Sequence, residues 1–351
     1  MAIWPVIRAI SPCFVSGTAI ISVGGLVAGI EAARYAPDNA ALATGLLTGA
    51  LTLVTALSPL VGAWIDHVGT FRPAMILSNL TLVLGSAVML AAAQTTSDAA
   101  FVCWCVGFGL LSIGVCLTVT TTQGIAAAFG AVNASKSGVL SGCWFFTTAF
   151  GGALGFVAGG VVLPVSSTDH RYYIYLLAIS LAFGALSLSV PISQLPLLAR
   201  AAAAADASSS SASASASTPS PSASASSHVR TVCGALCSML KDWALTPRYW
   251  AFRVVVVAKA IFQVGTGSFT SFALYFLQDC TEAGDAGAQR AMSILGLVNL
   301  FAALAAAYPA GKLADRFGSV LLVNIATFIS GCVLLIAPTV DKVTTRRGLN
   351  E

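Results

Sequence analysis

Two long apolar runs of the chain are separated by one short charged segment, residues 308–319, which reads YPAGKLADRFGS. The run before it (residues 291–311) and the run after it (residues 317–340) contain no Asp, Glu, Lys or Arg. Each run is long enough to cross a bilayer as a helix, which takes ~20 apolar residues at ~1.5 Å per residue. Asp315 and Arg316 give the turn between them the charge that a loop at the membrane surface needs. This hairpin predicts an α-helical membrane protein.

The same spacing of glycine and aspartate occurs a second time, in a segment that reads GAWIDHVGTFR and ends at Arg72. Both copies follow the pattern Gly-x-x-x-Asp-x-x-Gly, and both lie between charge-free apolar runs. The matching positions are Gly62, Asp66 and Gly69 in the first copy, and Gly311, Asp315 and Gly318 in the second. One copy would be weak evidence, but two copies in corresponding hairpins indicate two related halves.

The octet from Gly311 to Gly318 resembles the loop signature of the major facilitator superfamily, a large family of secondary transporters. In that family the signature follows the second span and recurs in weaker form after the eighth. The resemblance implies an all-α, polytopic membrane protein of the major facilitator type. Such a protein is built from two halves of six helices each.

The composition supports a membrane protein independently of the motif. Hydrophobic residues make up 57% of the 351 positions and charged residues only 9%, whereas soluble proteins have ~25% charged residues. The net charge of +4 is small and dispersed. No basic stripe with interleaved aromatic residues is present, so we do not expect a nucleic-acid partner.

Nine apolar stretches are long enough to be membrane spans. Six lie in the first part of the chain, at residues 12–30, 40–65, 73–94, 99–128, 137–164 and 172–191. Three lie in the second part, at residues 250–278, 291–308 and 319–338. We expect Glu31 and Arg34 to close the first span at the membrane surface.

The two parts are separated by residues 201–227, which are almost entirely Ala and Ser and have the composition of a flexible linker. We therefore expect a six-span amino-terminal half (residues 1–199), a cytoplasmic Ala/Ser-rich linker with an interfacial helix (200–248), and an incomplete second half of three spans (249–351). Relative to the family's plan, the sequence resembles a member truncated after the ninth span. It is either a fragment or truncated gene product, or a protein that departs from the plan.

The positions of lysine and arginine favour one orientation in the membrane. An amino terminus in the cytoplasm places both signature loops and the linker inside. The inner cations are then Arg8, Arg72, Lys136, Arg200, Arg230, Lys241, Arg248, Lys312 and Arg316. Only Arg34, Arg171 and Arg290 fall in outer loops, although the basic carboxyl-terminal tail would also lie outside, against the rule.

Asp66 and Asp315 are the functional positions that the resemblance supports best. An acidic side chain at a helix end can interact with the positive end of a neighbouring helix dipole. By resemblance, this contact latches the two halves in the outward-facing state, and Arg72 and Arg316 support the loops. The alternative is that these charges only keep the turns in water.

The seventh expected span carries two charges, Arg253 and Lys259, and is uncharged from residue 260 to residue 278. Gln263 shares the helix face of Lys259 one turn later. At ~1.5 Å per residue the lysine lies about 14 Å into the bilayer, where a charge needs water or a partner. Because the family lines its cavity with this span, Lys259 and Gln263 are candidate substrate contacts. Alternatively, the lysine reaches the cytoplasmic surface along its own flexible chain.

The fourth expected span carries a polar patch, Thr118 to Gln123, that either lines a cavity or bonds back to its own helix. Gln123 resembles part of the family's fourth-span motif and is a third candidate substrate contact. In the fifth span, Gly151, Gly155 and Gly159 recur every four residues, a spacing that lets helices pack closely.

No catalytic signature is present, and we expect neither an enzyme nor a cofactor. The nine cysteines lie mostly in apolar runs and predict packing rather than a metal site. The best-supported function is secondary active transport of a small solute by alternating access. The expected partners are a small-molecule solute, with or without a coupling proton or ion, and the bilayer of a plasma or organelle membrane. The alternative is a non-transporting receptor or scaffold, or an inactive truncated transporter.

Overall fold

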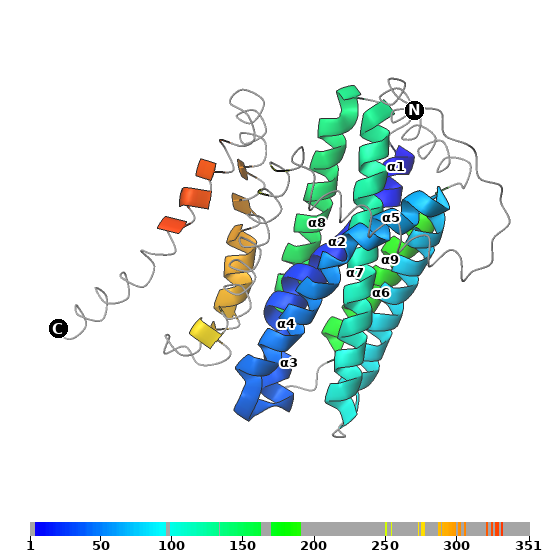
Figure 1. The fold of residues 1–351 in the computed structure, drawn as a ribbon. Helices are drawn as coiled ribbons and strands as arrows, with labels where there is room; N and C mark the ends of the chain where they lie inside the picture. The colour runs from blue at the N-terminus through cyan, green and yellow to red at the C-terminus, as the bar shows by residue number, and fades with distance from the viewer. Residues whose placement is uncertain are drawn as a thin grey trace. The chain divides into compact units, whose positions relative to one another are not determined.

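The computed structural model describes residues 4–95, 99–132, 134–162 and 170–190, together with short pieces between residues 250 and 332 (Figure 1). The regular elements in these described parts are all helical. The chain divides into two compact units, Met1–Leu297 and Val298–Glu351, and the labelled helices belong to the first. The domain boundaries expected near residues 199 and 248 lie outside the described residues.

Six helical stretches are long and apolar enough to cross a membrane. They are Trp4–Tyr35, Pro37–Asp66, Arg72–Ala93, Ala99–Phe129, Gly142–Gly159 and Arg171–Leu188. Their positions confirm the six spans expected before the linker. The chain is therefore an all-α, multi-pass integral membrane protein.

The first span is longer than the apolar run that predicted it. It consists of α1 (Trp4–Ile10), α2 (Cys13–Gly17), the π-helix η1 (Thr18–Val27) and α3 (Ala28–Tyr35). The expectation that Glu31 closes this span is wrong, because Glu31 is buried within α3, whereas Arg34 does lie in the last turn of that helix. The helix ends only at Ala36, whose φ of −138° leaves the helical region. Pro37 follows, and proline disfavours a helical conformation in the residue before it.

The other spans follow with short connections. They are formed by α4 (Ala40–Ala56) and α5 (Ser58–Val68), α6 (Arg72–Ala93), α7 (Ala99–Val132), α8 (Ala134–Val162) and α9 (Arg171–Leu188), with the 3-10 turn η2 (Pro37–Asn39) before α4. Prolines occupy the first turns of η2, α5 and α6, where the missing N–H has no helical partner to lose.

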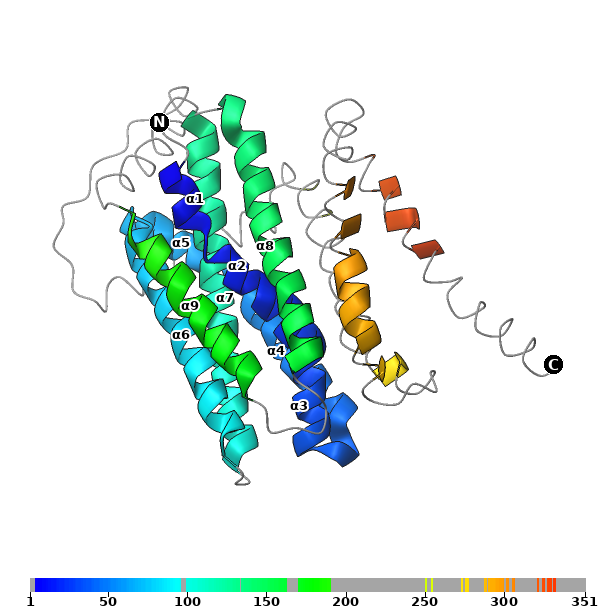
Figure 2. The ribbon, with the colours of Figure 1, turned by 180° about the vertical axis from the view of Figure 1, so that it is seen from behind.

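The helices pack in a bundle in which α6 lies between α7 and α9, and α8 lies against α2 and η1 (Figures 1 and 2). A Cβ atom on Gly155 would lie 2.7 Å from the Ser22 side chain, and one on Gly159 would lie 3.1 Å from Leu26. These contacts confirm that the glycines of the fifth span permit close packing, here against the first span.

The outer surface of α4 is apolar. Leu42, Leu46 and Leu53 are 64%, 67% and 68% exposed. A soluble protein rarely leaves such a continuous apolar face in water, whereas contact with lipid makes it favourable. These leucines therefore give α4 an apolar face that suits contact with lipid.

Candidate functional site

One acidic side chain lies inside the bundle, near the predicted outer end of the first span. Glu31 in α3 is 1% exposed, and it is the only acidic residue among the described ones that is buried. A carboxylate removed from water is costly unless hydrogen bonds or a nearby cation compensate it. An ionisable residue inside a membrane bundle is therefore a candidate functional residue.

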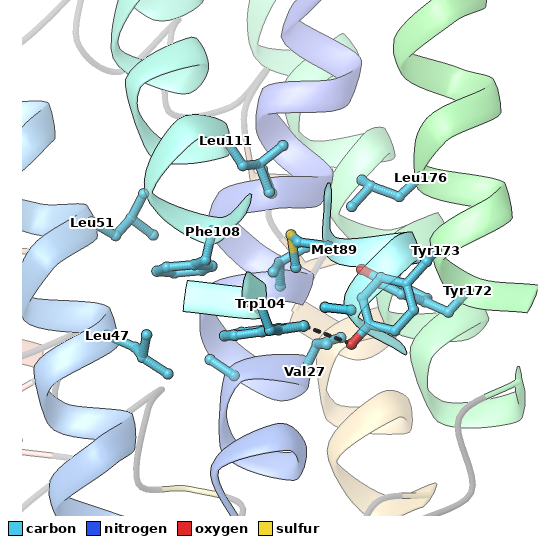
Figure 3. Close-up of a cluster of buried hydrophobic side chains, with 14 of the residues drawn as sticks. Val27, Leu47, Leu51, Met89, Trp104, Phe108, Leu111, Tyr172, Tyr173 and Leu176 are labelled. Carbon is cyan, nitrogen blue, oxygen red and sulfur yellow. Dashed lines mark hydrogen bonds between the residues drawn. The ribbon is translucent and has the colours of Figure 1, made fainter. Parts of the chain in front are cut away.

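Two aromatic side chains connect Glu31 to two other spans. The hydroxyl group of Tyr173 in α9 donates a hydrogen bond to Glu31 Oε1 at 2.5 Å. The indole Nε1–H of Trp104 in α7 donates to the Tyr173 hydroxyl oxygen at 3.0 Å, the bond drawn in Figure 3. Neither aromatic residue is exposed to solvent. The first, fourth and sixth spans are thus joined by one chain of polar contacts.

The surroundings of this chain are tightly packed and mostly apolar (Figure 3). Trp104 stacks on Phe108 with ring centroids 5.4 Å apart and an interplanar angle of 11°. Met89 and Leu176 belong to the same buried cluster. Well-packed neighbours hold the two aromatic rings in single orientations, so the hydrogen bonds from Trp104 to Tyr173 and from Tyr173 to Glu31 are fixed in direction.

The second oxygen of Glu31 faces a cation. Arg34 Nη1 lies 3.7 Å from Glu31 Oε2, one helical turn further along α3. At that distance the two groups form an ion pair, but they are too far apart for a hydrogen bond. Glu31 Oε2 has no hydrogen-bond partner. Arg34 is more exposed than Glu31, and it lies between the buried carboxylate and the end of the span.

Sequence reasoning missed Glu31, Tyr173 and Trp104 as a site. The available signal was the position of the first proline after the apolar run, because Ala36-Pro37 comes more than one turn after Glu31. The apolar run ends at Ile30, but a helix continues until something stops it. The partners Trp104 and Tyr173 carry no pattern of their own, since aromatic residues in apolar spans usually only fill the core.

A further contact at this end involves a residue beyond the linker. The Tyr275 hydroxyl group donates to the backbone carbonyl oxygen of Gly29 at 3.1 Å and is hydrogen-bonded to Thr44 at 2.7 Å. Leu26 and Ile30 share a buried cluster with Ala273, Ala288 and Met292. Residues of the second part of the chain therefore close against the first and second spans near Glu31.

The first signature loop lies at the opposite, predicted cytoplasmic end. Gly69 ends α5 with a φ of 68°, a conformation that favours glycine, and its N–H donates to the Ile65 carbonyl oxygen at 2.9 Å. Asp66 is exposed on the last turn of α5, and Gly62 lies one turn earlier.

Arg72, at the end of the same loop, contacts a different helix. Its Nη1 donates to the Leu188 carbonyl oxygen at 3.0 Å, so this residue supports the end of α9.

Two hydroxyl groups of the polar patch on the fourth span bond back to their own helix. The hydroxyl groups of Thr120 and Thr122 donate to the carbonyl oxygens four residues earlier, at 2.8 and 2.6 Å. Thr118 and Thr121 have buried hydroxyl groups without a hydrogen-bond partner. Gln123 is exposed, and the structure does not bring it near Glu31.

Six predicted site residues lie outside the described part of the chain. They are Lys259, Gln263, Gly311, Asp315, Arg316 and Gly318. Their suggested roles as substrate contacts and as the second latch loop remain predictions.

Comparisons with known proteins agree with the arrangement of the spans. The sequence model of the Major Facilitator Superfamily matches residues 9–345. No curated protein matches the chain. A crystal structure of a D-xylose–proton symporter has 16% sequence identity and a TM-score of 0.55, over 90% of this chain and 69% of that one.

The xylose transporter XylE from E. coli, in a partially occluded inward-open conformation, has 14% identity and a TM-score of 0.59. That match covers 89% of this chain and 74% of the transporter. At these identities the two structures show a shared fold, while the family model covers nearly the whole sequence. The chain belongs to the major facilitator superfamily of membrane transport proteins.

Proposed function

We propose that this protein is a secondary active transporter that moves a small solute by alternating access, coupled to a proton bound at Glu31. The observation that carries the proposal is the buried carboxyl group of Glu31, held by Tyr173. Such a group exchanges a proton only in conformations that let water reach it, so proton binding is tied to the transport cycle. One of the proteins that share this fold is a D-xylose–proton symporter, which supports a proton as the coupling ion.

The contacts of Tyr275 support alternating access. They join the second part of the chain to the first and second spans close to Glu31. Breaking them would open a path from outside to the carboxyl group, whereas keeping them closes that path. Lys259, Gln263 and Gln123 remain the proposed contacts for the solute.

The latch between the halves completes the proposal. Asp66 and Asp315 would bias the equilibrium between outward-facing and inward-facing states from the cytoplasmic end, where the loop orientation predicts both residues to lie. Arg72 and Arg316 would support the two loops.

The test is transport by the purified chain in proteoliposomes with an imposed pH gradient. D-xylose and a panel of radiolabelled sugars are the first solutes, because the fold is shared with a D-xylose symporter and a xylose transporter. Glu31→Gln should reduce accumulation of the solute driven by the pH gradient more than tenfold. It should still exchange solute between the two sides of the membrane at equal pH. Asp38→Asn changes an exposed acidic residue just beyond the same span and should behave as the wild type. Full accumulation by Glu31→Gln would contradict proton coupling at this residue.

A further inference from the structure

We propose that Tyr173 and Trp104 are positioning residues that set how readily Glu31 takes up its proton. The inference rests on the proposed coupling by Glu31 and adds the side chains that tune it. It starts from two hydrogen bonds in series, from Trp104 to Tyr173 at 3.0 Å and from Tyr173 to Glu31 at 2.5 Å.

The direction of this series is fixed by chemistry. An indole N–H can only donate, so the Tyr173 oxygen accepts from Trp104, and the tyrosine hydrogen is left for Glu31. A hydrogen bond to a charged acceptor is roughly twice as strong as one between neutral groups. The Tyr173 hydroxyl group therefore stabilises the carboxylate more than the protonated acid, and its removal favours the protonated acid.

Burial of Trp104 and Tyr173 strengthens their influence on the protonation of Glu31. Trp104 and Tyr173 are each 0% exposed, and Trp104 is clamped by its stacking on Phe108. Hydrogen bonds in a water-free interior polarise one another, so the Trp104 donor strengthens the Tyr173 donor. The same three groups belong to α3, α7 and α9, so a relative movement of these spans would lengthen the series and make Glu31 easier to protonate.

Other ionisable groups near Glu31 act differently. Arg34, at 3.7 Å, is the charged group with a contact to Glu31, and it faces the other carboxylate oxygen. The charged side chains on the surrounding elements, Asp38, Arg171 and Arg290, are exposed. The uncharged titratable side chains on these elements are Tyr35, Cys103, Cys105, Cys116, His170, Tyr172, Tyr175 and Tyr275. Of these, Tyr172 is the useful comparison, because it is as buried as Tyr173 but its hydroxyl group pairs with Ser22 at 2.9 Å.

The test is a pH titration of the purified full chain in lipid nanodiscs, followed by the infrared carbonyl band of a protonated carboxyl group. The proton is the only ligand, so no solute need be known. Glu31→Gln identifies the band of Glu31 by removing it. Tyr173→Phe should move the titration midpoint of that band upward by about one pH unit or more, the size expected for a hydrogen bond to a charged group.

Variants of Trp104 and Tyr172 test the same proposal in the same titration. Trp104→Phe should move the midpoint in the same direction but less, and the double variant should match Tyr173→Phe alone, because Trp104 acts through the tyrosine. Tyr172→Phe should leave the midpoint unchanged.

The titration separates failure of proton binding at Glu31 from failure of the positioning role of Tyr173. If no titrating band disappears in Glu31→Gln, the proposed proton coupling at Glu31 fails. If the band is present but Tyr173→Phe leaves its midpoint at the wild-type value, only the positioning role is overturned. A shift of equal size in Tyr172→Phe would also overturn it, because general loosening of the core would then explain both variants.

Discussion

Arg72 illustrates how one residue of a signature loop can act on a distant helix. Its Nη1 group donates to the carbonyl oxygens of Leu188 at 3.0 Å and Val190 at 3.2 Å, where α9 ends. The last carbonyl groups of a helix lack partners within the helix and carry the negative end of its dipole. Arg72 therefore caps the sixth span from the start of the third.

Replacing this arginine should lower stability. We expect Arg72→Ala to reduce the free energy of unfolding by about 1.5–3 kcal/mol, the range for a hydrogen bond to a charged group. Arg72→Lys should restore only part of the lost stability, because an ammonium group lacks the planar fork of donors of a guanidinium group. Thermal unfolding of the detergent-purified protein measures the stability of both variants. Arg8→Ala is the control, because Arg8 donates at the longer distance of 3.5 Å to the Ser189 side chain rather than to the last carbonyl groups of α9. An equal loss of stability in Arg8→Ala would contradict capping by Arg72.

At the scale of elements, the crossing of the first and fifth spans depends on glycine. A Cβ atom on Gly151 would clash with the Phe14 backbone, and one on Gly17 would clash with the Thr148 backbone. Backbone atoms cannot rotate away, so a larger residue must push the two helices apart. Small residues are what allow membrane helices to approach this closely.

This crossing predicts opposite results for two glycines of the same helix. Gly151→Ala should lower the melting temperature and reduce folded protein in the membrane, because the backbones must separate. Gly142→Ala has open space around its new methyl group and should be neutral or stabilising by up to about 1 kcal/mol, since alanine favours helices. Fluorescence-detected size-exclusion chromatography after heating compares the two. Equal melting temperatures would show that the crossing adjusts without cost.

The spans of the first half could be predicted from the sequence because each depends on a local property, the length of an uncharged run. Their ends were less predictable. The first span begins at Trp4 and passes Glu31 to end at Tyr35, because Pro37 stops its last helix, whereas a single charge does not. Of the predicted site, the structure describes the first signature loop and Gln123, and the second loop and Lys259 lie outside the described residues.

At the scale of the whole molecule, the site around Glu31 exists only after folding. Trp104 and Tyr173 are 69 residues apart, and Tyr173 and Glu31 are 142 apart. No spacing rule links such positions in a single sequence. Their meeting requires the first, fourth and sixth spans to pack side by side, which follows from complementary surfaces rather than from any local pattern.

The contact of Tyr275 with Gly29 and Thr44 offers a test of closure at the predicted outer end. Tyr275→Phe removes the hydroxyl group that joins the seventh expected span to the first two. If the protein works by the proposed alternating access, the equilibrium should shift toward the outward-open state, because the variant loses a contact that closes this end in the structure. The measurement is the rate at which an impermeant thiol reagent labels Leu47→Cys on intact cells, with the native cysteines removed. Leu47 is 8% exposed and lies one turn inward from Thr44.

The labelling rate should rise several-fold in Tyr275→Phe, and also in Thr44→Val, which removes the other partner. Thr48→Val is the matched control, because the Thr48 hydroxyl group donates to the carbonyl oxygens of Thr44 and Gly45 in its own helix. If labelling in Tyr275→Phe equals that of the parent, the contact does not hold the outer end closed. If Thr48→Val accelerates labelling as much as Thr44→Val does, loosening of α4 rather than loss of the Tyr275 contact explains the change. A selective effect of the two contact variants would therefore tie exposure of the region around Glu31 to one pair of hydrogen bonds between the first and second parts of the chain.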